Sequence, residues 1–213
     1  MELSSAQQST VISLYLFSVF PAAIVIALYL AGKFPRWLMA TYIGTFIACA
    51  IGWELWISYG LAGGMDVISR RPEAMNSAIP LHINWLLNSL GDAGPVGLSG
   101  ALLVWLAYGR TNTAFTQWRW GAFSILLTWF IAQNLYVELY MYQAQLAEGF
   151  PISWAPLMPT GSWYNPVVFT LDGRVAQLQT QLPWLLMTPI YYGLLLRCYK
   201  KWGPKLNTNS ANP

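Results

Sequence analysis

Five long stretches of apolar residues alternate with segments rich in polar and charged residues along the chain. The apolar stretches cover residues 10–30, 37–61, 80–108, 118–142 and 178–196. A helix needs about 20 mostly apolar residues to cross the hydrocarbon core of a bilayer, and each stretch approaches or exceeds that length. The pattern therefore predicts an all-α, polytopic integral membrane protein, with one five-helix transmembrane bundle over residues 1–204. We expect residues 205–213 to form a disordered cytoplasmic tail.

The first apolar stretch does not have the features of a cleavable signal peptide. Such a peptide has a basic start and an apolar core of about 7–15 residues. Here Glu2 precedes the stretch, no basic residue does, and the apolar run is longer. We therefore expect the first stretch to be a permanent span.

Lysine and arginine residues are distributed unevenly over the segments that five spans would leave on the two sides of a membrane. Three of the 11, namely Arg70, Arg71 and Arg174, lie in the second and fourth connecting segments, and the remaining residues lie in the first and third segments and after the fifth stretch. Because cytoplasmic segments carry an excess of basic residues, we expect the N-terminus outside or in a lumen and the C-terminus in the cytoplasm. The membrane would be the plasma or inner membrane of a bacterium, or the endoplasmic reticulum of a eukaryote.

The composition excludes several classes of chemistry. Only 9% of the residues are charged, against about 25% in soluble domains. His82 is the single histidine, and Cys49 and Cys198 are the only cysteines, whereas haem, di-iron and zinc sites need several imidazoles or thiolates. No lysine lies within an apolar stretch to form a retinal Schiff base. We therefore expect no metal and no cofactor, and we interpret the net charge of +3 as a membrane-flanking pattern and not as a nucleic-acid site.

Two connecting segments are long, residues 62–79 and 148–177, and both are expected on the outer side. A loop of about 30 residues without an obvious helix is uncommon and often functional, so the second segment is a candidate lid. The alternative is that its tryptophans and tyrosines belong to the interfacial aromatic belt. We expect His82, near the outer end of the third stretch, to be an interfacial residue and not a catalyst.

Three acidic residues fall inside the apolar stretches: Glu54, Asp92 and Glu138. A charged group at the bilayer centre costs roughly 2.5–3.5 kcal/mol on insertion scales, and such residues are functional-site candidates by default. No basic residue lies in the interior of the stretches to pair with them, since Arg119 stands at the very start of the fourth. We therefore expect each to be neutral or hydrated in a cavity.

Helical spacing places other polar and aromatic residues beside these acids. Asn84, Asn88 and Asp92 are each four residues apart and so share one helix face, as do Asn134 and Glu138. The pattern predicts one interior pocket with seven substrate-binding residues: Trp53, Trp56, Asn84, Asn88, Asn134, Gln181 and Trp184. The alternative is that the amides only form hydrogen bonds that hold the helices together.

A carboxylic acid surrounded by aromatic rings has a definite use in catalysis. When neutral, it can protonate an alkene or an epoxide, and the aromatic faces stabilise the carbocation that follows. We expect Glu54 to be this acid. Asp92 and Glu138 are candidates for accepting a proton or for orienting the acid.

Three segments resemble the emopamil-binding, or EXPERA, family of five-helix membrane proteins. They are Tyr15-Leu-Phe-Ser-Val19, Ala132-Gln-Asn-Leu-Tyr-Val-Glu-Leu-Tyr140 and Gln181-Leu-Pro-Trp-Leu185, and the order of short and long connecting segments is also similar. The family includes sterol delta-8,delta-7 isomerases and sigma-2 receptor-type binding proteins. The resemblance implies that Gln181 and Trp184 line a pocket for a sterol-like molecule.

The second stretch departs from the isomerase pattern. The isomerases carry a histidine and a glutamate one turn apart, whereas this chain has Ala48 to Gly52 there and Glu54 two residues later; their acid in the third helix falls near Ser99. Gly52-Trp53-Glu54-Leu55 instead resembles the Trp-Glu element of integral-membrane terpene cyclases, which protonate an epoxide or alkene but have seven helices. The catalytic acids therefore do not carry over from the isomerases.

Three functions follow as hypotheses. The first is a membrane enzyme that isomerises or cyclises a lipophilic isoprenoid, terpenoid or sterol-like substrate by protonation. The second is a non-catalytic lipid- or sterol-binding or transport protein. The third is a structural subunit of a membrane complex, with Gly94, Gly97 and Gly100 as a docking surface, although these glycines could equally let helices of one chain approach closely. The expected partners are the lipophilic substrate and membrane lipids, and self-association into a homo-oligomer is left open.

Overall fold

The computed structural model describes residues 2–61, 65–147, 149–150, 163 and 165–204, and most of them are helical. Four helices are long and apolar enough to cross a membrane, namely Ser5–Leu30, Arg36–Tyr59, Leu81–Ala107 and Trp120–Gln145. They confirm that the first four predicted spans are long apolar helices. The expected tail, residues 205–213, and most of the candidate lid lie outside the described residues.

The fifth predicted span is also a helix, α8 (Leu178–Trp202), but it is less apolar than the other four. Its first half contains Gln179, Gln181 and Pro183, and a second proline, Pro189, follows. α8 packs against the second and fourth long helices. The helix is thus confirmed, whereas five membrane crossings remain a prediction.

Three of the long helices change pitch from α-helical to π-helical along their length. The second consists of α2 (Arg36–Cys49), the π-helical η1 (Ala50–Glu54) and α3 (Leu55–Tyr59). The third consists of α5 (Leu81–Gly91), the π-helical η4 (Asp92–Leu98) and α6 (Ser99–Ala107). The fourth consists of α7 (Trp120–Tyr136), the π-helical η6 (Val137–Tyr142) and the 3₁₀-helical η7 (Gln143–Gln145). The first long helix, α1 (Ser5–Leu30), is α-helical throughout.

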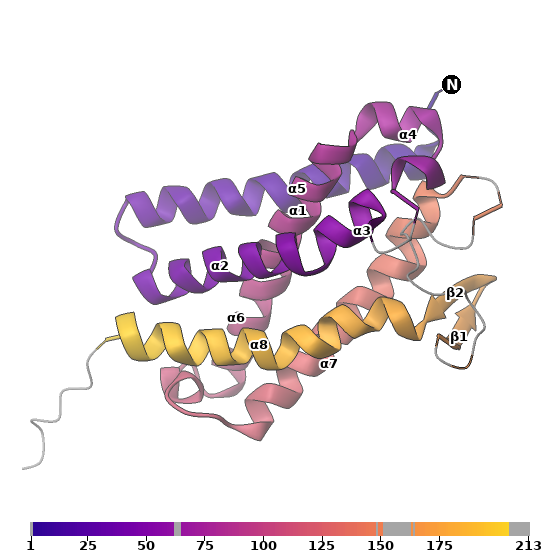
Figure 1. Ribbon diagram of the computed structural model, residues 1–213. Helices are drawn as coiled ribbons and strands as arrows, with labels where there is room; N and C mark the ends of the chain where they lie inside the picture. Colours follow the sequence, from indigo (N-terminus) through magenta and orange to yellow (C-terminus); the bar gives the residue numbers. More distant parts are fainter. Residues whose placement is uncertain (1, 62–64, 148, 151–162, 164, 205–213) are drawn as a thin grey trace, which may run out of the picture.

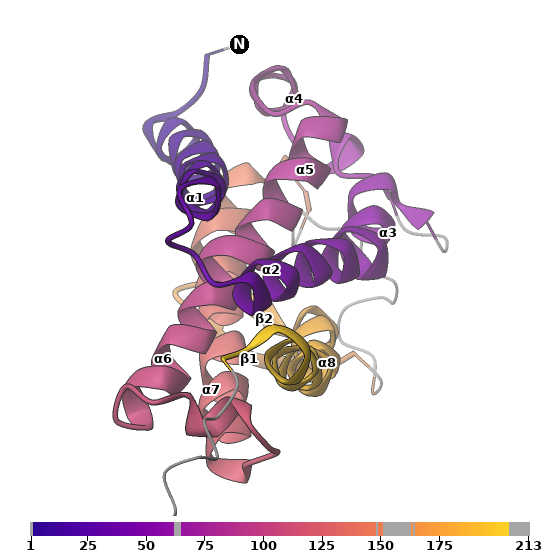
Figure 2. The same cartoon turned by 90° about the vertical axis from the view of Figure 1, so that its left-hand side faces the viewer.

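The long helices form a bundle in two orientations. In Figure 1, α1, α2 and α8 run roughly parallel with α2 between the other two, whereas the third and fourth helices cross them; Figure 2 shows α1 and α8 close to end-on. The N-terminus, η3 (Ile68–Arg70), α4 (Glu73–Ala78) and the end of the fourth helix gather at one end. The end of α1, η5 (Asn112–Phe115) and the end of α8 gather at the other.

Local sequence signals explain where several helices begin and end. Ser4 and Gln7 form a reciprocal capping box at the start of α1. Pro35 and Pro80 directly precede the second and third helices, where a missing backbone N–H costs least. Gly60 ends the second helix in the left-handed conformation, which glycine adopts without steric strain.

A two-stranded antiparallel sheet precedes α8, and the all-α prediction missed it. β1 (Val167–Leu171) pairs with β2 (Arg174–Gln177) through a turn at Asp172 and Gly173, both with positive φ. An Asp-Gly pair suits a tight hairpin turn because both positions require that conformation. The hairpin thus places Gln177 and the start of α8 beside the end of the fourth helix.

Small residues allow the helices to approach closely in the core. A Cβ atom on Gly97 would meet the Tyr191 ring at 3.3 Å, and one on Gly100 would meet Phe130 at 3.2 Å. Gly94 likewise faces Pro21 and Tyr42. All three glycines are buried within the chain, so their interpretation as an outward docking surface is wrong.

Candidate functional site

A cavity of about 290 Å³ lies among α1, the second, third and fourth helices, and α8. Six of the ten residues that the sequence suggested as site residues line it: Trp53, Glu54, Asn88, Asp92, Asn134 and Trp184. They come from four different helices, so the fold brings together polar positions that are far apart in sequence. The cavity is close to the small end of the range of about 300–1,000 Å³ in which ligand pockets fall.

Glu54 is the most deeply buried carboxyl group of the cavity, with 4% of its surface exposed. Its Oε2 atom has no hydrogen-bond partner in the part of the chain that the structure describes. The Asn88 and Ser58 side chains lie close to the carboxyl group. A buried polar oxygen without a partner is costly, and such atoms mark sites where strain or function is retained.

Asp92 is the second carboxyl group of the cavity, and Trp53 positions it. The indole Nε1 of Trp53 donates a hydrogen bond to Asp92 Oδ2 at 3.0 Å. The Cys49 thiol also lies against this carboxyl group. Asp92 and Glu54 are near enough for their charges to interact, so one carboxyl group affects the protonation of the other.

Aromatic side chains form an aromatic wall that lines part of the same cavity. The Trp53 and Trp184 ring centroids are 5.4 Å apart, and Trp184 also contacts Phe130 at 4.9 Å. Trp129 lines the cavity as well, and its Nε1 donates to the Val96 carbonyl at 2.9 Å. Rings held in this way present fixed π faces, which attract a cation that forms beside them.

Each of the three acids within the long apolar helices lies in a π-helical segment. Glu54 ends η1, Asp92 begins η4, and Glu138 is the second residue of η6. π-helical turns are rare and occur frequently at functional sites. In η4, Pro95 removes a backbone donor, which favours a departure from α-helical bonding.

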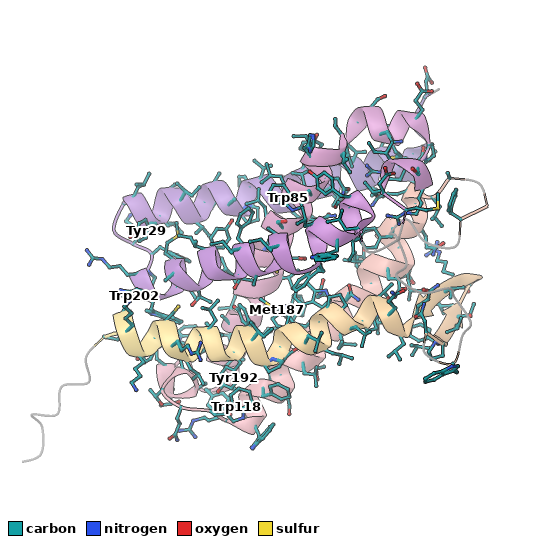
Figure 3. The ribbon with its side chains drawn as sticks, viewed as in Figure 1. Tyr29, Trp85, Trp118, Met187, Tyr192 and Trp202 are labelled. Carbon is teal, nitrogen blue, oxygen red and sulfur yellow. The ribbon has the colours of Figure 1, made fainter. Side chains whose placement is uncertain are left out.

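Aromatic donors bind the carbonyl groups of these π-helical segments. Trp85, labelled in Figure 3, donates from Nε1 to the Ala50 carbonyl in η1 at 2.9 Å. Trp129 and the Tyr191 hydroxyl group donate to Val96 and Gly97 in η4. The helices that surround the cavity therefore hold the irregular backbone in place.

Glu138 lies outside the cavity lining, with none of its surface exposed. Its Oε1 accepts a hydrogen bond from the Gln177 backbone N–H at 3.1 Å, and its Oε2 accepts one from Gln181 Nε2 at 2.7 Å. Gln181 Oε1 in turn accepts a hydrogen bond from Asn134 Nδ2 at 2.8 Å. The structure therefore places Glu138 and Gln181 behind Asn134, which is the member of this chain that reaches the cavity.

Two further residues from the sequence prediction do not line the cavity. Asn84 donates to Ser58 Oγ at 3.1 Å and accepts from Arg71 at 3.1 Å, so it lies between the cavity and the segment before α4. Trp56 is 42% exposed, and its Nε1 donates to the Ile51 carbonyl. His82 is exposed beside the Tyr59 hydroxyl group at 2.6 Å.

The cavity has a mouth on the side of the bundle. Phe17 of α1 and Tyr136 of α7 line it, and their exposed fractions are 58% and 60%. Both residues lie in the long apolar helices, away from the connecting segments. The mouth therefore faces the surface that lipid would cover if these helices cross a membrane.

Two buried arginines are the main feature that sequence reasoning missed. Arg70 is 1% exposed and Arg71 is 4% exposed. Arg71 donates to Asn84 Oδ1, to Gln145 Oε1 and to the Ile79 carbonyl, and Arg70 donates to the Asp66 and Ile57 carbonyls. Both lie in a connecting segment, where basic residues are usually exposed, and the adjacent Arg-Arg pair before Pro72 is the only local signal that they differ.

Among the described residues, no group of three or more histidine, cysteine, aspartate or glutamate side chains is arranged to hold a metal ion. Comparison of the chain with protein-family models, with curated protein sequences and with solved structures finds no match. The function is therefore argued from the cavity and its residues.

Proposed function

We propose that the protein is an integral membrane enzyme that isomerises or cyclises a lipophilic isoprenoid, terpenoid or sterol-like molecule by protonating it. The observation that carries the proposal is Glu54, a buried carboxyl group in an aromatic cavity that also contains Asp92, with one oxygen that no described residue binds. A carboxyl group in an apolar cavity can keep its proton until a substrate binds. It can then deliver that proton to an apolar substrate.

The arrangement supports a balanced proton-transfer sequence. The Glu54 carboxyl group donates its proton to one carbon of a substrate double bond, which forms a C–H bond and leaves a cation on the neighbouring carbon. The Trp53 and Trp184 faces stabilise that cation. Loss of a proton from an adjacent carbon to the Asp92 carboxylate completes an isomerisation, and proton exchange between the two carboxyl groups restores the starting state. In a cyclisation, a second double bond of the substrate attacks the cation before that loss.

The proposed setting is a membrane that all five long helices cross. The four apolar helices support this setting, and α8 packs against two of them. The basic residues favour a cytoplasmic location for the end with the α8 C-terminus, which leaves the N-terminus outside or in a lumen. The substrate then reaches the cavity from the lipid phase, through the mouth beside Phe17 and Tyr136.

A Glu54→Gln variant tests the proposed function. Wild type, Glu54→Gln and a control, Glu73→Gln at an exposed position, are purified in detergent from the same membranes, and their organic extracts are compared by mass spectrometry. We expect one lipid to accumulate in Glu54→Gln and an isomer or cyclised form of it to accompany wild type and the control. Conversion by Glu54→Gln at the wild-type rate would refute the role of Glu54.

A non-catalytic lipid-binding or transport protein is the second candidate. The observation that favours it is the mouth in the apolar surface, which suffices for reversible binding without any chemistry. It predicts the same unaltered lipid in wild type and in Glu54→Gln. The structural-subunit hypothesis has lost its main support because Gly94, Gly97 and Gly100 pack inside the chain.

A further inference from the structure

Arg70 and Arg71 are buried at the end of the bundle where the second helix ends and α4 begins. Their hydrogen bonds go to carbonyl and amide oxygens, and neither guanidinium group forms an ion pair with a carboxylate in the part of the chain that the structure describes. The nearby Asp66 carboxylate instead accepts hydrogen bonds from the Ser69 backbone N–H and hydroxyl group. Asp66 is within electrostatic reach of Arg70, but among the described residues no carboxylate is hydrogen-bonded to either guanidinium group.

Each arginine also retains an unused donor. Arg70 Nη1 and Arg71 Nε are buried and have no hydrogen-bond partner among the described residues. A buried charged donor without an acceptor is costly, and an anionic ligand would supply the missing oxygens. Burial lowers the pKa of Arg70 to about 9, with the charge of Arg71 acting in the same direction, and burial lowers that of Arg71 to about 10. An anion bound next to the two guanidinium groups would raise both pKa values again.

A chain of contacts joins these arginines to the cavity. Arg71 donates to Asn84, Asn84 donates to Ser58, and Ser58 lies against the Glu54 carboxyl group. Tyr142, which lines the cavity, lies within electrostatic reach of both guanidinium groups and of Glu54 and Asp92. Neither guanidinium group lines the cavity itself, and both lie beside it, within electrostatic reach of Tyr142.

We propose that Arg70 and Arg71 bind the phosphate or diphosphate group of a short isoprenoid whose hydrocarbon chain occupies the cavity. The assignment of the chain to the cavity rests on the proposed function. A phosphate group suits the site because it offers several oxygens and about two negative charges to two guanidinium groups. Protonation of a double bond leaves the phosphate ester intact, so the headgroup fixes the register of the chain against Glu54 and is not itself consumed. The small volume of the cavity favours a geranyl or farnesyl chain over a sterol.

Binding to wild-type protein in detergent tests the headgroup without any substitution. The quenching of tryptophan fluorescence is measured with farnesyl diphosphate and with farnesol, because Trp53, Trp129 and Trp184 line the cavity. We expect farnesyl diphosphate to bind about ten- to a hundredfold more tightly, the range expected for charge-assisted hydrogen bonds. Inorganic pyrophosphate should compete with it and should not compete with farnesol. Equal affinities for the two isoprenoids would overturn the proposal, and binding of pyrophosphate that leaves farnesyl diphosphate unaffected would indicate a separate free-phosphate site and would also overturn it.

Variants then assign the effect to these residues. Arg71→Gln and Arg70→Lys should each reduce the preference for the diphosphate about tenfold, with farnesol binding unchanged. Arg174→Gln is the matched control, because Arg174 lies in the same outer region and its guanidinium group packs over Tyr140 at 4.6 Å. An undiminished preference in Arg71→Gln would contradict the proposal. If that variant does not fold, the wild-type comparison and Arg70→Lys decide the question.

The headgroup site and the proposed enzyme activity can be confirmed or refuted independently. Tight, arginine-dependent binding of farnesyl diphosphate without any conversion would support the headgroup site and count against the enzyme. Conversion of farnesol with no preference for the diphosphate would support the enzyme and refute the headgroup site.

Discussion

The indole Nε1 of Trp53 donates a hydrogen bond to Oδ2 of Asp92 at 3.0 Å, and Trp53 directly precedes Glu54 in sequence. The residue next to the proposed acid is thus fixed by the other carboxyl group of the cavity. Because Trp53 also packs on Trp184, one side chain links both carboxyl groups to the aromatic wall. Trp53 therefore contributes both a hydrogen bond and an aromatic face, and substitutions can distinguish the two.

Trp53→Phe should retain an aromatic face and lose the hydrogen bond to Asp92. We expect it to lower turnover about tenfold, in line with the loss of one hydrogen bond to a charged group. Trp53→Leu should lower turnover further, because it removes the π face as well. Rates are measured on the substrate found in the wild-type extract, with Trp56→Phe as a control, since Trp56 lies outside the cavity lining. Equal losses in Trp53→Phe and Trp53→Leu would show that the ring contributes nothing to catalysis.

Gly97 of η4 packs closely against α8 and α2, so we expect a side chain added at this position to destabilise the fold. A Cβ atom there would meet the Asp92 carbonyl at 3.2 Å and the Tyr191 ring at 3.3 Å. We expect Gly97→Ala to lower the free energy of unfolding by about 1–3 kcal/mol, the usual range for overpacking. Gly52→Ala is the matched control, because its Cβ would meet no atom within 4 Å, and it should be neutral or stabilising. Thermal melting in detergent checks both variants, and a Gly97→Ala melt as high as that of Gly52→Ala would contradict the packing argument.

The periodicity of the sequence predicted the four apolar helices and a stripe of Asn84, Asn88 and Asp92 because both depend on local spacing, and two members of the stripe, Asn88 and Asp92, line the cavity. It did not predict that Glu138 would leave the cavity although Asn134, one turn earlier, lines it. Asn134 and Glu138 do share one helix face, because both side chains bond to Gln181. Glu138 lies outside the cavity because Gln177 of β2 and Gln181 of α8 bind the two oxygens of its carboxyl group. These contacts join segments far apart in sequence, so local spacing does not predict them.

The burial of Arg71 was beyond sequence reasoning for the same reason. Its partners are Asn84 of the third helix and Gln145 at the end of the fourth, so its burial depends on contacts between distant segments. The hairpin, in contrast, had a local signal in Asp172-Gly173 between β-branched and apolar residues, which the apolar periodicity of the long stretches obscured.

The chain of hydrogen bonds from Glu138 through Gln181 to Asn134 predicts a rescue by exchange. In Glu138→Gln, the new amide Nε2 would face Gln181 Nε2, so two donors would oppose each other and Gln181 would have to reverse its amide at the expense of Asn134. We expect a loss of about 1–3 kcal/mol in the free energy of unfolding, the penalty for a buried polar group left unsatisfied.

The double variant Glu138→Gln/Gln181→Glu should recover most of that loss. The glutamine at position 138 would accept from the Gln177 N–H and donate to the glutamate at position 181, whose second oxygen would accept from Asn134. Thermal melting of the two single variants and the double variant gives the interaction energy of the pair. If the double variant loses as much free energy of unfolding as the two single variants lose together, Glu138 does not act through Gln181. Turnover should follow stability in these variants, in contrast to Glu54→Gln, where turnover is lost and the fold is kept.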